Sequence, residues 1–198
     1  MKKTISALAL AFLAFGAQAQ TNASWVSNDN DIDFLSIKIT QKKRSVTETS
    51  NFGSSQATLN ADGDFKLDID LNSVKTNIDL RDQRLRDWVF ETGKFGKATI
   101  TGKVDAGKVN QLAVGQAIQL EQPLKLDLHG QQSDIEAVLN VHRVAEDKIQ
   151  VNTLTPVLLD TKDMGLESGV QRLVQVMGLL SIVDQVPVNF SGEFVRQP

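Results

Sequence analysis

Strict alternation of apolar and polar side chains recurs along this chain and dictates the kind of sheet it can form. The clearest example is FKLDIDL, residues 65–71, in which every second side chain is apolar. Residues 124–129 and 186–194 repeat the pattern. Such alternation is typical of a β-strand with one buried face. Further strands are predicted over residues 35–40, 46–52, 97–104, 135–141 and 148–151.

Short polar segments between these strands carry turn chemistry. NADGD at residues 60–64 and DAGK at residues 105–108 predict tight hairpin connections. About eight antiparallel strands, each with one apolar face, must bury that face and protect their edges, and closure into a barrel does both. The sequence therefore predicts an all-β fold with two short helices, an antiparallel barrel whose interior is either filled or holds one small ligand. A sandwich with a filled core is the alternative.

Residues 163–180 break the alternation and follow helical spacing instead. Their apolar side chains gather on one face of a helical wheel, while the opposite face is polar. Asp163 is the predicted N-cap. The segment is predicted to be an amphipathic helix that covers one end of the barrel. A helix lying on a membrane surface is the alternative, although Arg172 is the single cation on its polar face.

Residues 78–90 form a second helical segment, which is rich in charge. On a helical wheel most of its charges point to solvent, and Asp82 lies at the rim, in register with Arg86. Arg81 instead projects within the apolar stripe, between Leu85 and Trp88. A cation in that position needs a partner. Arg81 is therefore predicted to tie the helix to a carboxylate or backbone carbonyl beside the barrel wall, with a ligand head group as the alternative partner.

The first 19 residues have the three regions of a secretory signal peptide. Lys2 and Lys3 form the positive start, residues 5–15 form the apolar core, and residues 17–19 read Ala-Gln-Ala, a small-x-small cleavage pattern. Cleavage is expected after Ala19, which leaves residues 20–198 as one exported domain without a transmembrane segment. The apolar core is too short to span a bilayer, and an uncleaved signal anchor is the alternative.

Composition argues against several classes of function. The net charge is −3, or −5 without the two lysines of the signal, so nucleic acid is not an expected partner. The basic run at residues 42–44 is predicted to be a solvated turn, with contact to an anionic membrane as the alternative. There is no cysteine, and neither His129 nor His142 stands beside a metal-ligand or catalytic motif. No metal, cofactor or catalytic residue is therefore predicted, and an enzyme is the weaker class.

Several motifs follow one another in an informative order. They are Trp25, IDFLSIKIT at residues 32–40, Phe52 at the end of a strand, the step from Ser73 to Thr76, RDQRLR at residues 81–86 and LKLDLHG at residues 124–130. This order resembles the YceI-like family of exported bacterial proteins, over roughly residues 24–195. The chain departs from that family in two respects. KITQKK at residues 38–43 replaces a histidine expected shortly after the first strand, and Pro123 and Leu124 stand where a glycine usually opens the Leu-x-Leu-His-Gly strand.

The resemblance implies a lipocalin-like barrel in the periplasm whose pore takes up an elongated isoprenoid, such as a polyprenyl chain or a quinone tail, without catalysis. The apolar strand faces would line this pore. The predicted lining residues are Phe34, Leu67, Ile69, Leu71, Leu126, Leu139, Val141, Val188 and Phe190.

A filled barrel without lipid cargo, acting as an interaction or stress-associated envelope protein, is the main alternative. Small inward side chains would keep the pore open, and Ala137 and Gly192 are the candidates. An enzyme acting on an apolar substrate is a third hypothesis, which would require a polar cluster inside the pore. The sequence sets neither the identity of the ligand nor the oligomeric state, and a homodimer is left open.

Overall fold

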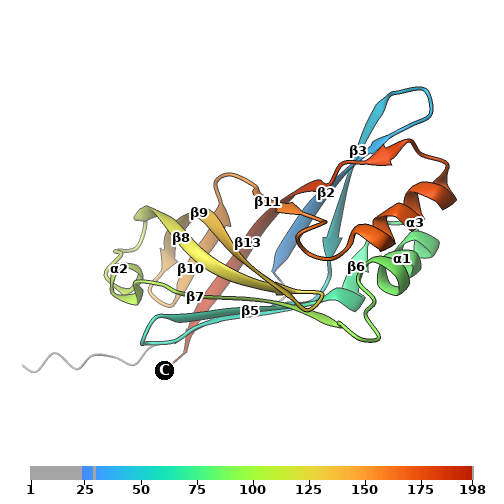
Figure 1. Cartoon of the computed structure of the whole chain (residues 1–198). Helices are drawn as coiled ribbons and strands as arrows, with labels where there is room; N and C mark the ends of the chain where they lie inside the picture. The colour runs from blue at the N-terminus through green and yellow to red at the C-terminus, as the bar shows by residue number, and fades with distance from the viewer. Residues whose placement is uncertain (1–23, 29, 198) are drawn as a thin grey trace, which may run out of the picture.

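Strands dominate the fold (Figure 1). The computed structural model describes residues 24–28 and 30–197, and the predicted signal peptide lies outside them. The strands are β1 (Ser24–Asn28), β2 (Asp31–Ile39), β3 (Ser45–Phe52), β4 (Ser55–Leu59), β5 (Asp64–Asp70), β6 (Val74–Lys75), β7 (Lys97–Lys103), β8 (Ala117–Leu128), β9 (Gln131–Ala145), β10 (Lys148–Thr153), β11 (Val157–Asp160), β12 (Ser181–Ile182) and β13 (Gln185–Gln197). The helices are α1 (Asp79–Arg84), which continues as a π-helical turn (Leu85–Val89), α2 (Ala106–Asn110) and α3 (Glu167–Met177). A 3-10 turn spans Leu71–Ser73.

The strands close into an antiparallel barrel. Eight of them follow the order β1, β4, β5, β7, β8, β9, β10 and β13, and β13 pairs back with β1. The register brings inward side chains level with one another, since Leu67 of β5 lies opposite Ile100 of β7, and Ile100 lies opposite Leu126 of β8. This closed barrel of eight antiparallel strands, with few short helices, confirms the predicted fold.

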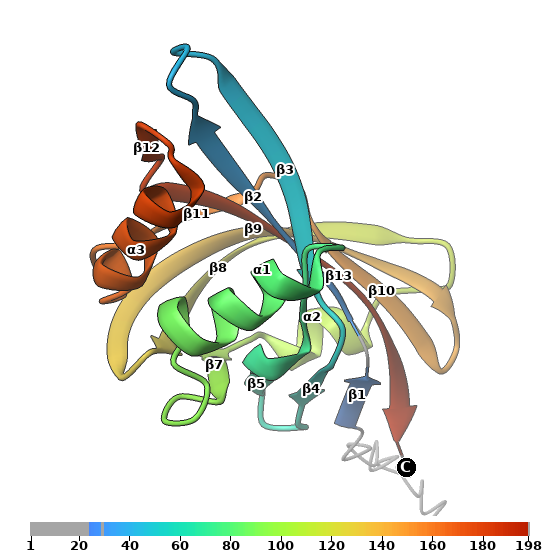
Figure 2. The same cartoon turned by 90° about the vertical axis from the view of Figure 1, so that its right-hand side faces the viewer.

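The β2–β3 hairpin extends the wall beyond one end of the barrel (Figure 1 and Figure 2). Where β2 departs from the line of β1, the buried Asn30 accepts a hydrogen bond from Ser27 Oγ (2.5 Å) and donates one to Ser55 Oγ (3.0 Å). A Cβ on Gly192 would lie only 2.1 Å from Asn30 Oδ1. Gly192 therefore makes room for the asparagine at this bend, which is not the pore-opening role considered for it from the sequence.

Helix α3 lies with α1 at the same end of the barrel as this hairpin (Figure 2). It begins at Glu167, so the prediction of Asp163 as its N-cap is wrong. Gly165 has a φ of +68°, and the preceding residues form turns closed by a hydrogen bond from Leu166 N to the Thr161 carbonyl (2.8 Å). This left-handed backbone delays the helix. The helix ends at Gly178, which is left-handed as a C-terminal glycine commonly is.

Helix α2 lies at the opposite end of the barrel (Figure 1). The sequence interpreted its first residues, DAGK, as a hairpin turn, and this was wrong. Asp105 accepts a hydrogen bond from Lys108 N (3.2 Å) and so acts as an N-cap, which starts a short helix rather than a tight turn. NADGD does form the predicted hairpin turn, between β4 and β5, with Gly63 at a φ of +89°.

Packing of α3 on the π-helical turn depends on Gly169. A Cβ at that position would lie 2.1 Å from the Trp88 carbonyl oxygen. Gly169→Ala is therefore expected to force the two elements apart and to lower the free energy of unfolding by about 1–3 kcal/mol, as overpacking does. Chemical denaturation measures this loss. Gly93→Ala is the matched control because a Cβ there meets no atom within 4 Å, and an equal effect of both substitutions would contradict the prediction.

Candidate functional site: an apolar pore with a charged mouth

Two adjoining cavities occupy the interior of the barrel. The lower cavity, toward α2, has a volume of about 120 Å³, and the upper cavity, toward α1 and α3, has a volume of about 170 Å³. The two cavities share six lining side chains, which form the waist between them: Ile32, Ile69, Ile100, Leu126, Leu159 and Val188. The interior thus offers an elongated space along the barrel rather than one round chamber.

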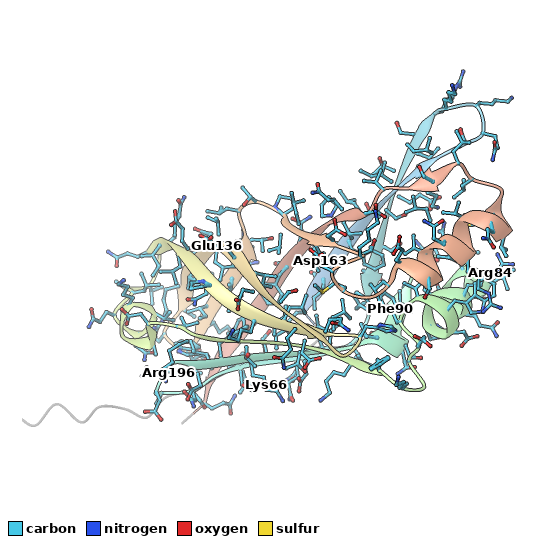
Figure 3. All side chains as sticks on the ribbon, in the orientation of Figure 1. Lys66, Arg84, Phe90, Glu136, Asp163 and Arg196 are labelled. Carbon is cyan, nitrogen blue, oxygen red and sulfur yellow. The ribbon has the colours of Figure 1, made fainter. Side chains whose placement is uncertain are left out.

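Strand alternation explains why this space is apolar. On β5, Leu67 and Ile69 are buried and line the cavities, while Lys66 is exposed and Asp68 lies on the outer face. Figure 3 shows Lys66, and Glu136 of β9, on the outside of the wall. Partial burial raises the pKa of Asp68, but hydrogen bonds from Lys66, Thr99 and Lys97 outweigh it and hold that pKa below its usual range. The outer face of β5 is therefore charged and its inner face is apolar.

The structure places every predicted lining residue on a cavity wall. Seven line the lower cavity: Leu67, Ile69, Leu126, Leu139, Val141, Val188 and Phe190. Phe34 and Leu71 line the upper cavity, together with Ile69, Leu126 and Val188 of the waist. Ala137 lines the lower cavity, as expected of a small inward side chain. That these residues bind a ligand stays a prediction.

Few polar side chains line the lower cavity, and most of them are hydrogen-bonded to the wall. Its polar side chains are Gln122, Thr153 and Asn189. Gln122 donates to the carbonyls of Lys103 and Pro123 (both 3.0 Å), and the Thr153 hydroxyl accepts from Phe190 N (3.1 Å). These bonds satisfy the wall itself, so the lower cavity suits a hydrocarbon chain better than a polar group.

The lower end of the barrel is packed. Trp25 is fully buried there, and its indole Nε1 donates to Asn110 Oδ1 (3.0 Å) at the end of α2. The Arg143 guanidinium lies 5.2 Å from the centre of the Trp25 ring, a cation–π contact. Val109 of α2, which is 2% exposed, closes the lower cavity beside them.

The upper cavity combines an aromatic wall with charge. Phe34, Phe52 and Phe90 line it in series, with ring centres 5.3 Å and 5.7 Å apart. Phe90 is labelled in Figure 3, just after the π-helical turn. On β2 the side chains that face this cavity beyond Phe34 are polar, namely Ser36 and Lys38. The β2–β3 hairpin therefore adds polar side chains to the upper cavity, whereas the barrel strands line it with apolar ones.

Three charged side chains form what we call the mouth cluster: Lys38 of β2, Glu48 of β3 and Arg81 of α1. Lys38 is only 7% exposed, and its ammonium group contacts Glu48 Oε2. Arg81 Nη1 contacts the same oxygen, and Nη2 donates to the Thr76 carbonyl (2.7 Å). The hydrogen bond from Lys38, with the charge of Arg81, holds the pKa of Glu48 below its usual range. Arg81 thus contacts both a carboxylate and a carbonyl, and its structural role stays a prediction.

Asp82 holds the loop that positions Arg81. It is buried, and its carboxylate accepts hydrogen bonds from the backbone N (2.8 Å) and the hydroxyl of Thr76. The sequence had placed Asp82 at the rim in register with Arg86, which is wrong. Ile78 is 51% exposed because it precedes the helix. The sequence did offer a signal for this contact, namely a threonine shortly before a helix that carries an aspartate in its first turns.

The lowered pKa of Glu48 predicts an acid limit to the stability it contributes. Its carboxylate is charged and paired at neutral pH, so the contribution is fully present above the ordinary Glu pKa and is lost as pH falls through the lower folded value. We expect the difference in melting temperature between the unchanged protein and Glu48→Gln to shrink progressively below about pH 4.5. A difference of the same size at about pH 3 would contradict this.

Other side chains give no sign of a reaction centre. His129 lies 2.8 Å from a Glu91 carboxylate oxygen, but within residues 24–28 and 30–197 no group of three or more His, Asp or Glu side chains is placed to hold a metal ion. None of the helices in the same part of the chain is long and apolar enough to cross a membrane. The absence of a metal, a cofactor and a catalytic residue stays a prediction from the sequence.

Comparison with known proteins shows which family the barrel resembles. The model of the YceI-like domain matches residues 17–194. A polyisoprenoid-binding domain from Saccharophagus degradans, implicated in plant cell wall breakdown, is 36% identical and superposes with a TM-score of 0.81 over 87% of this chain and 98% of that one. None of the curated proteins matches the chain significantly.

Two more distant structures share the fold alone. Burkholderia cenocepacia BcnA is 14% identical, with a TM-score of 0.60 over 83% of this chain and 95% of that one. The Campylobacter jejuni YceI protein is 18% identical, with a TM-score of 0.54 over 75% and 84% of the two chains. The extent of the family match and the 36% identity to the Saccharophagus domain together show that the chain belongs to the YceI-like family.

Proposed function

We propose that this protein binds and carries an elongated apolar lipid, a polyisoprenoid or quinone-like chain, inside its barrel. The observation that carries the proposal is the pair of apolar cavities that adjoin at the waist and run from the mouth cluster to the packed lower end. The Saccharophagus domain, whose polyisoprenoid binding gives it its description, supports the same class of ligand. We place this activity in the periplasm, as the predicted signal peptide implies.

The mechanism is burial without chemistry. Enclosing about 100 Å² of hydrocarbon surface contributes about 2.5 kcal/mol, before the costs of association. Selectivity then follows the length and width of the space. The waist, formed by six branched aliphatic side chains, admits a slim chain more readily than a bulky ring system. No reaction is required, and no cofactor other than the bound lipid itself.

Entry is expected at the upper end. Glu48 is a third exposed, so the mouth cluster lies where the upper cavity meets solvent, beside the hairpin, α1 and α3. Leu173 and Met177 of α3 line this cavity, and the Arg172 guanidinium rests 4.0 Å from the centre of the Trp88 ring. We propose α3 as the lid. It forms part of the cavity wall, but it packs mainly on the π-helical turn and on β12 rather than on the barrel strands themselves.

The direct test is extraction of the protein from the periplasm. Purified protein is extracted with organic solvent, and the extract is analysed by mass spectrometry for prenyl chains and quinones. Uptake of a fluorescent polyene by the delipidated protein is measured in parallel. A co-purifying isoprenoid, or saturable uptake that an isoprenoid displaces, supports the proposal. Absence of both would support the alternative, an envelope protein with a filled barrel and no lipid cargo.

A further inference from the structure

Some of the buried hydrogen-bonding groups on the walls of the upper cavity have no partner. Among the described residues, two buried polar atoms that belong to this wall have no partner, namely Arg81 Nε and Thr161 Oγ1. The Lys38 ammonium has three hydrogens and makes one hydrogen bond, to Glu48. Buried polar groups are almost always satisfied in native proteins. An acceptor supplied by a ligand would meet this surplus.

The two cations of the same wall share one carboxylate. Lys38 and Arg81 share the single carboxylate of Glu48, and both contact the same oxygen. Asp160 of β11 also borders the cavity and brings a second carboxylate to its wall, where its Oδ1 accepts from Lys162 N (2.9 Å). Within the mouth cluster, however, two cations share one carboxylate, and their remaining hydrogen-bond donors are unfavourable to bury without an acceptor.

We propose that the upper cavity selects lipids whose apolar chain ends in a singly charged anionic oxygen group, such as a carboxylate. The inference rests on the proposed function and adds to it the chemistry and orientation of the ligand. The head group completes the mouth cluster by accepting from Lys38 and Arg81, and Thr161 donates its hydroxyl. The chain then passes the waist and ends against α2. An uncharged head group gains the same burial but accepts more weakly from these donors.

Matched probes separate the head group from the chain. Geranylgeranoic acid and geranylgeraniol have the same hydrocarbon chain and differ in charge, so the ratio of their dissociation constants at about pH 8, where the acid is ionised, isolates the mouth cluster. The unchanged protein is expected to prefer the acid by about tenfold or more, as charge-assisted hydrogen bonds to a buried site imply. Intrinsic tryptophan fluorescence or displacement of a fluorescent polyene reports both constants.

Two substitutions change the cluster charge in opposite directions. Lys38→Met keeps the length of the side chain and leaves Glu48 paired with Arg81, so it is expected to abolish the preference for the acid while binding of the alcohol is kept. Glu48→Gln leaves two cations and is expected to increase the preference severalfold. Lys42→Met removes one charge from the exposed hairpin turn, outside the cavity wall, and is expected to change nothing.

The possible results distinguish the proposal of an anionic head group from the proposal of lipid binding. Equal affinity for both probes in the unchanged protein, or an acid preference that survives Lys38→Met, would overturn the anionic head group and leave lipid binding intact. Failure to bind either probe would overturn lipid binding and the inference with it. Melting curves show whether each variant is folded, and if Lys38→Met is not, the increase expected of Glu48→Gln decides the question alone.

Discussion

Replacing Asp82 with alanine is expected to lower the free energy of unfolding by about 2–4 kcal/mol, because a buried charged acceptor is lost and its donors stay buried. The donors are the backbone N–H and the hydroxyl of Thr76, which is 5% exposed. For a domain of this size the melting temperature should fall by about 5–15 °C. Differential scanning calorimetry measures both quantities.

Asp87→Ala is the control for this substitution, since Asp87 belongs to the same helical segment but is exposed. It should stay within about 0.5 kcal/mol of the unchanged protein. Thr76→Val tests the cause, because it removes the hydroxyl that Asp82 accepts from. The double variant should lose less than the sum of the two single losses. Additive losses would show that Asp82 stabilises the protein by some route other than the Thr76 hydroxyl.

Filling the lower cavity should shorten the pore. Ala137 is 4% exposed and lines that cavity, so Ala137→Phe places a ring in the space reserved for the end of the chain. Excluding about 80 Å² of a twenty-carbon isoprenoid from this space forfeits about 2 kcal/mol, which corresponds to an increase of about thirtyfold in Kd. A ten-carbon chain, which the upper cavity can hold, should bind as before. Displacement of a fluorescent probe gives both constants.

Val138→Phe provides the control, because strand alternation turns the neighbouring side chain out of the cavity wall. It adds the same ring without shortening the pore, and both chain lengths should bind normally. If Ala137→Phe weakens both chains equally, the variant has disturbed the barrel as a whole. If it weakens neither, the ligand does not reach the lower cavity, and the pore proposed here is too long.

Strand periodicity made the pore walls predictable. The direction of a side chain in a strand depends only on whether its position is odd or even, so Leu67 and Ile69 of FKLDIDL could be assigned to the interior without any tertiary information. The closing of the barrel followed from the number of such strands. Small shifts at the strand ends do not alter that facing, which is why the nine predicted side chains all lie on the walls.

The mouth cluster could not be predicted in the same way. Lys38 and Glu48 meet across a hairpin. On β2 beyond Phe34, Ser36 and Lys38 face inward, and alternation turns Leu35 and Ile37 outward, the reverse of the barrel strands. Asp82 was misplaced because a helical wheel treats a segment as one regular helix and ignores what precedes it. The partner of Asp82 is Thr76, in the loop before α1.

The packed lower end has a consequence for traffic. Trp25 and α2 pack the far end of the described barrel, so a lipid bound as proposed would enter tail first at the upper end and leave head first along the same path. Donor and acceptor therefore approach the same face in turn and cannot be served together. For the proposed carrier, the direction of net transfer would then be set by the relative affinities of the donor and the acceptor for the lipid.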